Sequence, residues 1–250
     1  MAAYHIVLDF EMNPVPCSIR NRFGGLATEI IEIGAVKIDA QTCQVIDRYC
    51  QLVKPLFNQR IEPDITELTG ITTRGVAGCP TFQAAMEDFI RWIDAAPNLV
   101  YCWSPNDLYQ LKKECKAKRV KFPKVLAHWI DFQKRYPIAL GLPGQPCMSL
   151  EKAAHLAGIP VLPNLRHQAV YDAEITAKLI QLTKTGMYQF NSYRVRPAVA
   201  AGIHDMTYSI GDVCSDALRV WLSRFDASEK KEYEPYDIPG YSAGAELLRI

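Results

Sequence analysis

The order of apolar and polar positions predicts strands in the first part of the chain. Residues 4–10 form an apolar run, and residues 28–39 and 44–54 alternate between apolar and polar side chains. Only a short polar gap separates the second segment from the third, so these two should pair as a hairpin. Two later apolar segments, 99–103 and 125–132, predict a further strand and either a strand or a strand–helix mixture.

Helical patterns begin after the hairpin and alternate with the later strands. The segment 81–96 places apolar residues on one helical face. Punctuating residues predict the ends of the other helices: a capping box at Asp64 and Glu67 with a stop at Gly70, a start at Pro105, a cap at Ser149 with an end near Gly158, and a long helix over 167–184 that stops at Gly186.

This order of elements predicts an α/β fold in which helices flank a mixed β-sheet. The predicted domain covers residues 1–186. Residues 187–250 differ in character, with several prolines and glycines and one helix-like segment, and are predicted to be a C-terminal extension of unknown role.

Composition narrows the class of protein without naming a partner. An apolar fraction of 49% is ordinary for a globular chain, and the formal net charge of +1 means that any charge that attracts a ligand must be local. No apolar run approaches the roughly 20 residues of a membrane span, and no export signal is apparent. The eight cysteines lack zinc or disulfide spacing. A cytoplasmic location with reduced thiols is expected.

Candidate chemistry begins with two acids in the first strand. Asp9 and Glu11 are two residues apart, so a strand would project both from one face, and such close carboxylates need a cation or hydrogen-bond donors nearby. Asp107 follows the strand at 99–103 at the start of a helix. His167 precedes Asp172 by five residues, which would leave their side chains about 140° apart on a helix. His167 is therefore expected at the loop–helix junction, with Asp172 facing inward.

The order DFE, TEIIEIGAV, ELTGIT, W-x3-D-x3-L and H-x4-D-A-x3-A resembles the DEDDh exonucleases, ribonuclease-H-like 3′→5′ enzymes. The match spans about residues 4–184, and DFE, VKP and ELTGIT favour the branch that trims histone mRNA and small RNAs. In the sister DEDDy group a tyrosine stands four residues before the last aspartate. That position is Gln168 here, whereas His167 fits the histidine form.

The resemblance implies a role for each residue. Asp9, Glu11, Asp107 and Asp172 would hold two Mg²⁺ or Mn²⁺ ions, since oxygen ligands suit these metals. His167 would take a proton from the attacking water. The product would be a nucleoside 5′-monophosphate. Glu32 is a further candidate buried acid, or else faces solvent on its strand.

Predicted substrate-binding residues flank the acids: Phe10, Met12, Leu68, Thr69, Gly70, Ile71 and Trp103. Leu68 and Ile71 are equally interpretable as core residues, and strict alternation would bury Phe10. Residues 112–124 carry seven basic side chains and one acid, which indicates either a solvated helix face or a phosphate track. Arg20, Arg22 and Arg166 are placed to contact phosphate.

The expected partner is nucleic acid with a free 3′ end, favouring single-stranded RNA. A DNA-directed proofreading or repair exonuclease and a catalytically idle nucleic-acid-binding domain of the same fold are the alternatives. No residue can be assigned to recognition of the 2′-hydroxyl.

Overall fold

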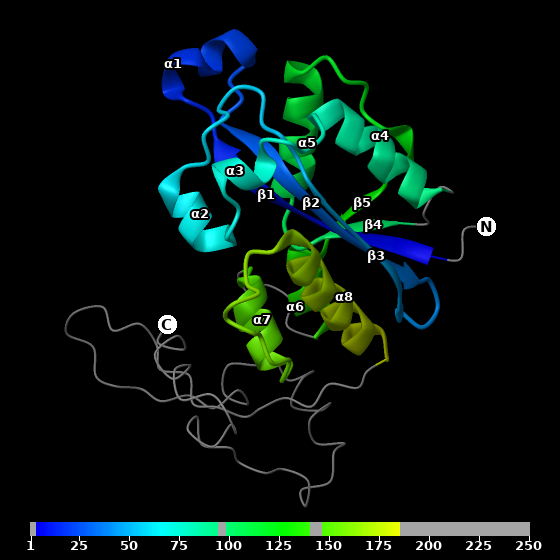
Figure 1. Ribbon diagram of the computed structural model, residues 1–250. Coiled ribbons are helices and arrows are strands. Elements are labelled where there is room, and N and C mark those ends of the chain that lie inside the picture. The colour runs from blue at the N-terminus through cyan, green and yellow to red at the C-terminus, as the bar shows by residue number, and fades with distance from the viewer. Residues whose placement is uncertain (1–3, 95–98, 141–146, 186–250) are drawn as a thin grey trace, which may run out of the picture.

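A computed structural model describes residues 4–94, 99–140 and 147–185. Its centre is a mixed five-stranded sheet with helices on both faces, which confirms the predicted α/β class (Figure 1). The strand order is β3-β2-β1-β4-β5. The strands are β1 (Tyr4–Pro14), β2 (Thr28–Asp39), β3 (Val45–Leu52), β4 (Val100–Cys102) and β5 (Trp129–Asp131). The first three are antiparallel neighbours, and β4 and β5 run parallel to β1.

Strand β1 is four residues longer than predicted. Its pairing with β2 continues to Pro14, opposite Thr28, with a bulge between Glu11 and Met12. Continued hydrogen bonding to a neighbouring strand keeps the polar residues after Phe10 in the sheet. Asp9 and Glu11 therefore lie inside the central strand, and the bulge beside Glu11 is of the kind often found next to active sites.

Two helical layers cover the sheet. Helices α4 (Phe82–Ile93) and α5 (Asn106–Ala117) pack on one face with the β1 residues Ile6, Leu8 and Phe10. Helices α6 (Phe132–Ala139), α7 (Leu150–Leu156) and α8 (Ala169–Thr185) pack on the other face with Val7. Alternate residues of β1 thus enter different cores. Asp9 and Glu11, two and four residues after Val7, belong to the face that α8 covers.

Short helices connect these layers at the end of the sheet where β1 finishes. They are α1 (Cys17–Arg20), η1 (Asn21–Phe23), α2 (Pro63–Thr69) and α3 (Thr73–Val76). The short helix η2 (Lys124–Leu126) instead precedes β5, toward the end of the sheet where β1 begins. The predicted capping box at Asp64 was wrong: Glu62 holds the N-cap position without a side-chain cap, and Pro63 opens α2. Gly70, with φ +75°, ends α2 as predicted.

The other helix boundaries follow local signals closely. Thr81 and Ser149 accept the cap hydrogen bonds of α4 and α7. The segment 125–132 contains the end of η2, strand β5 and the first residue of α6.

Gly186 and the predicted extension 187–250 lie outside the described residues. Among those that are described, no helix is both long and apolar enough to cross a bilayer, and the seven cysteines are all free thiols.

Candidate active site

Three acids and a glycine face α8 from the neighbouring strands β1 and β2. Asp9 pairs with Gly34 across β1 and β2, and Glu11 pairs with Glu32. Directly opposed residues on antiparallel strands project from the same face. Three carboxylates are thus placed together: Glu11 and Glu32 are buried, and Asp9 is partly exposed.

Gly34 lets the start of α8 lie directly on β2. A Cβ atom built on Gly34 would be 2.1 Å from both the Ala169 carbonyl carbon and the Val170 nitrogen. These are backbone atoms, so a side chain at position 34 can be accommodated only by moving the helix. The missing side chain is what allows Asp172, in the first turn of α8, to reach the acids of β1.

Asp107 approaches the same strand from α5. Strand β4 is short and pairs with β1 only near Ile6 and Val7, and α5 begins four residues after β4 ends. The buried carboxylate of Asp107 accepts a hydrogen bond from the Phe10 backbone N–H. This bond holds Asp107 against Phe10, the β1 residue between Asp9 and Glu11.

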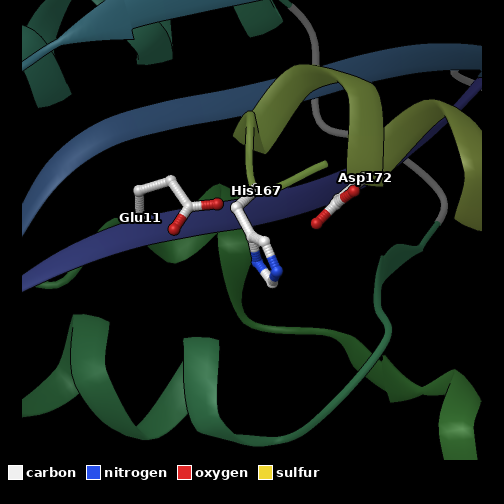
Figure 2. A group of neighbouring side chains, drawn as sticks. All are labelled: Glu11, His167 and Asp172. Carbon is white, nitrogen blue, oxygen red and sulfur yellow. The ribbon is translucent and has the colours of Figure 1, made fainter. Parts of the chain in front are cut away.

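His167 stands at the junction before α8, as the sequence predicts. It has φ +58°, a left-handed conformation that is uncommon for residues other than glycine. Its backbone N–H donates to the Asp172 carboxylate. Figure 2 shows the His167 ring between Glu11 and Asp172, and one potential ligand atom from each of the three lies within 4.8 Å of the others.

Glu32 is buried and supports this junction, which settles the alternative left open by its position on an alternating strand. One carboxylate oxygen accepts from the Ala169 N–H at the start of α8, at 2.9 Å. The other accepts from the Cys50 thiol at 3.2 Å. Glu32 therefore fixes the first turn of α8, two residues beyond His167.

The carboxylates raise one another's pKa values. Burial, followed by the charges of Asp107, Asp172, Glu11 and Glu32, raises the pKa of Asp9 well above its usual range. Burial and the neighbouring carboxylates raise the pKa of Glu11 to about 9. Burial likewise raises the pKa of Asp107 to about 7 and that of Asp172 to about 6. Without a cation, these groups cannot all be ionised at neutral pH.

This donor set suits a hard divalent cation. It offers carboxylate oxygens on several elements, and Mg²⁺ and Mn²⁺ prefer oxygen ligands. Cations bound here would also compensate the mutual repulsion that raises the pKa values. The residues fit the predicted metals, with the His167 imidazole as a neighbouring group.

The residues predicted to bind substrate divide into exposed and buried sets. Leu68 is 49% exposed at the end of α2, and Gly70 is also exposed. Thr69 and Ile71 are buried, the latter in a small core cluster. Phe10 is buried, as alternation predicts, whereas Met12 is partly exposed. Leu68, Gly70 and Met12 thus remain available to a ligand.

Trp103 belongs to the core of the domain. Its ring is 6% exposed and packs on Phe132 and Tyr136. The indole N–H donates to the Met148 carbonyl oxygen at 3.2 Å. Its one polar group already has a partner inside the protein. We therefore leave Trp103 out of the proposed substrate-binding surface.

The side chain of one basic residue in the segment 112–124 is buried. The Lys118 ammonium forms ion pairs with Glu114 at 2.7 Å and Glu29 at 2.8 Å, and its side chain is 6% exposed. It therefore belongs to an internal charge cluster and cannot contact a phosphate. Among the arginines, Arg166 pairs with Glu151 at 2.6 Å, Arg20 donates to the Val15 carbonyl, and Arg22 is exposed.

Asn13 is a supporting residue that sequence reasoning missed. Fully buried two residues after Glu11, it donates to the Asn58 and Arg60 carbonyls and accepts from the Glu62 N–H. It thus fastens the segment leading into α2 to the strand that carries the acids. No local sequence pattern indicates this role of Asn13. For Gly34 a signal did exist, since a glycine within an alternating strand indicates close backbone approach.

A mixed sheet of this order, with acids and a histidine converging on its central strand, defines a ribonuclease-H-like exonuclease domain. The family model RNase_T, described as Exonuclease, matches residues 6–180. The chain therefore belongs to this family, in its DEDDh 3′–5′ exonuclease group, which confirms the predicted resemblance.

Individual proteins show the same relationship. ERI1 exoribonuclease 2 of Danio rerio is 28% identical over 204 residues, which cover 73% of this chain and 35% of the relative. A crystal structure of the nuclease domain of 3′hExo, a DEDDh family member bound to rAMP, superposes with a TM-score of 0.63 at 21% identity. It covers 75% of this chain and 94% of that one.

A second solved structure concerns recognition of the 3′ end of a histone mRNA stem-loop by a 3′-exonuclease. It has a TM-score of 0.63 at 20% identity and covers 84% of this chain and 92% of that one. At these identities the structures establish the shared fold. The chain spans about 35–42% of the length of the first curated relatives it matches.

Proposed function

We propose that this protein is a 3′→5′ exonuclease that removes nucleoside 5′-monophosphates from single-stranded RNA ends. The observation that carries the proposal is the convergence of five groups from β1, α5 and the α8 junction on one point of the sheet: Asp9, Glu11, Asp107, His167 and Asp172. Membership of the exonuclease family supports the reaction type.

In this mechanism Asp9, Glu11, Asp107 and Asp172 would hold two Mg²⁺ or Mn²⁺ ions. When bound, such ions stabilise the charge that develops on the attacking and leaving oxygens. The His167 imidazole accepts the proton of the attacking water. Burial, with the charge of Arg166, lowers the pKa of His167, so the ring is neutral and able to accept a proton at pH 7.

Two acids also keep the general base in place. Asp172 accepts from the backbone N–H of His167, and Glu32 accepts from that of Ala169. Both bonds act on the backbone, which leaves the imidazole ring free to reorient toward a water molecule. Asp172 therefore serves the metal site and the position of the base together.

RNA is the proposed substrate because of the relatives. The Danio rerio protein is named an exoribonuclease, and one structural neighbour concerns histone mRNA. The exposed Leu68 and Gly70 at the end of α2 offer an apolar surface on which a terminal base can stack.

A labelled-oligomer assay tests this function. A single-stranded RNA carrying a 5′ label, incubated with Mg²⁺ or Mn²⁺, should yield a ladder that shortens from the 3′ end. DNA of the same sequence should be degraded more slowly. Faster loss of DNA would favour the proofreading or repair alternative. Binding of either oligomer without degradation, by folded protein with both metals, would favour the idle nucleic-acid-binding domain.

His167→Ala should slow RNA hydrolysis by about 10²- to 10⁴-fold, the usual contribution of a general base. Metal binding should persist, because the carboxylates remain. Single-turnover rates measure the first effect, and the shift of melting temperature with Mn²⁺ concentration measures the second. His128→Ala, at an exposed histidine on the loop before β5, is the matched control. A large loss of Mn²⁺ affinity would instead make His167 a ligand.

A further inference from the structure

The exposed face of α5 carries one aromatic residue and three lysines in a single stripe. Tyr109, Lys112, Lys113 and Lys116 have the spacing i, i+3, i+4 and i+7, which places them on one side of a helix. The opposite side, with Asp107, Leu111 and Cys115, is buried. Tyr109 is 57% exposed, and the three lysines are exposed as well.

The stripe is positively charged because Glu114, the one acid between Tyr109 and Lys116, points inward. Glu114 is fully buried and is neutralised there by Lys118. Lys112, Lys113 and Lys116 form no ion pair with any residue in the described ranges 4–94, 99–140 and 147–185. The internal ion pair thus leaves the surface of α5 with uncompensated cations in a chain whose formal net charge is only +1.

The stripe begins at the N-terminal end of α5, the end that carries Asp107, but on the side of the helix opposite to this acid. Tyr109 follows Asp107 by two residues, and α5 continues for eight residues beyond Tyr109. From Tyr109 to Lys116 the helix rises about 10 Å, which equals the axial length of about three stacked nucleotides. A flat exposed ring followed by cations is the combination with which proteins hold single strands regardless of sequence, by base stacking and phosphate contacts.

We propose that this stripe, Tyr109–Lys112–Lys113–Lys116, binds the part of a single-stranded nucleic acid that lies 5′ of the nucleotide being removed. The proposal rests on the proposed exonuclease function and adds a substrate track to it. Tyr109 stacks on a base, and the lysines contact consecutive phosphates. A substrate too short to reach the stripe gains nothing from it.

A comparison of long and minimal substrates tests the track. The double variant Lys112→Gln/Lys116→Gln should raise the KM for a single-stranded 12-mer about tenfold, with kcat unchanged, and should leave hydrolysis of a dinucleotide unaffected. Tyr109→Ala should also weaken 12-mer binding about tenfold. The matched control is Lys152→Gln/Lys178→Gln, which removes the same charge from exposed positions of α7 and α8.

Direct binding separates failure of the track from failure of the enzyme. The fluorescence anisotropy of a labelled 12-mer gives its binding constant at several salt concentrations. The slope of the logarithm of this constant against the logarithm of salt concentration should be smaller by about 1.4 in the Lys112/Lys116 variant than in the wild type, because two phosphate contacts are lost. An equal change in the control, or none in the stripe variants, would overturn the track while 12-mer hydrolysis upholds the function. If wild-type protein hydrolyses neither substrate, the function fails, and the binding comparison still decides the track.

Discussion

Asp9→Asn should reduce RNA hydrolysis by at least about 10³-fold. Asp9 lies at the centre of the acid cluster, where Asp107, Asp172, Glu11 and Glu32 all act on its pKa. An amide keeps the shape of the side chain but removes a charged metal ligand, and a loss of about 4 kcal/mol in transition-state stabilisation corresponds to this factor. The rate of 3′ shortening of a labelled RNA measures the effect.

The same substitution should stabilise the protein when no metal is present. Because burial and the neighbouring carboxylates raise the pKa of Asp9, its ionisation is less favourable in the folded state than in the unfolded chain, and this cost lowers the free energy of unfolding at pH 7. Asparagine removes this cost. A melting temperature a few degrees above that of the metal-free wild type is expected at pH 7, with a smaller gain near pH 4.

The pH dependence of the metal-free wild type follows from the same pKa values. Glu11, Asp107 and Asp172 have raised pKa values of about 9, 7 and 6. Each keeps its proton in the folded state above the pH at which the unfolded chain loses it. The free energy of unfolding therefore falls as pH rises from about 4 to about 9, and added Mg²⁺ or Mn²⁺ should restore it.

Glu87→Gln provides the control for Asp9→Asn, since it makes the same acid-to-amide change at an exposed position of α4. It should alter neither hydrolysis nor the response of the melting temperature to metal. An Asp9→Asn protein that retains a tenth of the wild-type rate would contradict the role given to Asp9. An unchanged melting temperature across pH 4–9 would contradict the electrostatic description of the cluster.

Gly34→Ala should destabilise the protein and inactivate it together. The new methyl group would be 2.1 Å from backbone atoms of Ala169 and Val170, so α8 must move away from β2. Overpacking of this kind costs about 1–3 kcal/mol or more. Displacement of α8 also shifts His167 and Asp172 from Glu11, and misplacement by about 1 Å can cost roughly 100-fold in rate.

The matched control for this prediction is Gly78→Ala, where an added Cβ meets nothing within 4 Å. At such a site the loss of backbone freedom in the unfolded chain is neutral or slightly stabilising. Thermal unfolding and single-turnover hydrolysis of both variants give the answer. A Gly34→Ala protein with wild-type stability and rate would show that α8 does not need its close approach to β2.

Much of the secondary structure was predictable because its causes are local. Alternation along 28–39 is enough to predict a strand, and Thr81 and Ser149 cap their helices with their own hydroxyl groups. Helix α6 was not predicted beyond Phe132, its first residue. It is short, and Pro137 within it is a residue that ordinarily argues against a helix.

The acids of the candidate site were also predictable, since their types and order along the chain match a family pattern. The residues that hold the site and its surrounding elements in place were not predictable. Glu32 bonds to Ala169, 137 residues away, and Lys118, at the end of α5, pairs with Glu29 of β2. Nothing in the local sequence distinguishes these charged residues from solvated ones.

The sequence by itself therefore determined most of the strands and longer helices, whose causes are local, and the acids and histidine of the candidate site, whose types and order match a family pattern. Only the tertiary structure decided which charges are buried and paired, that β1 continues past Glu11, and that Trp103 lies in the core. These outcomes depend on long-range backbone pairing and packing. Gly34 links the sequence to the tertiary structure. Because this residue has no side chain, α8 can lie close enough to β2 to bring His167 and Asp172 to the acids of β1.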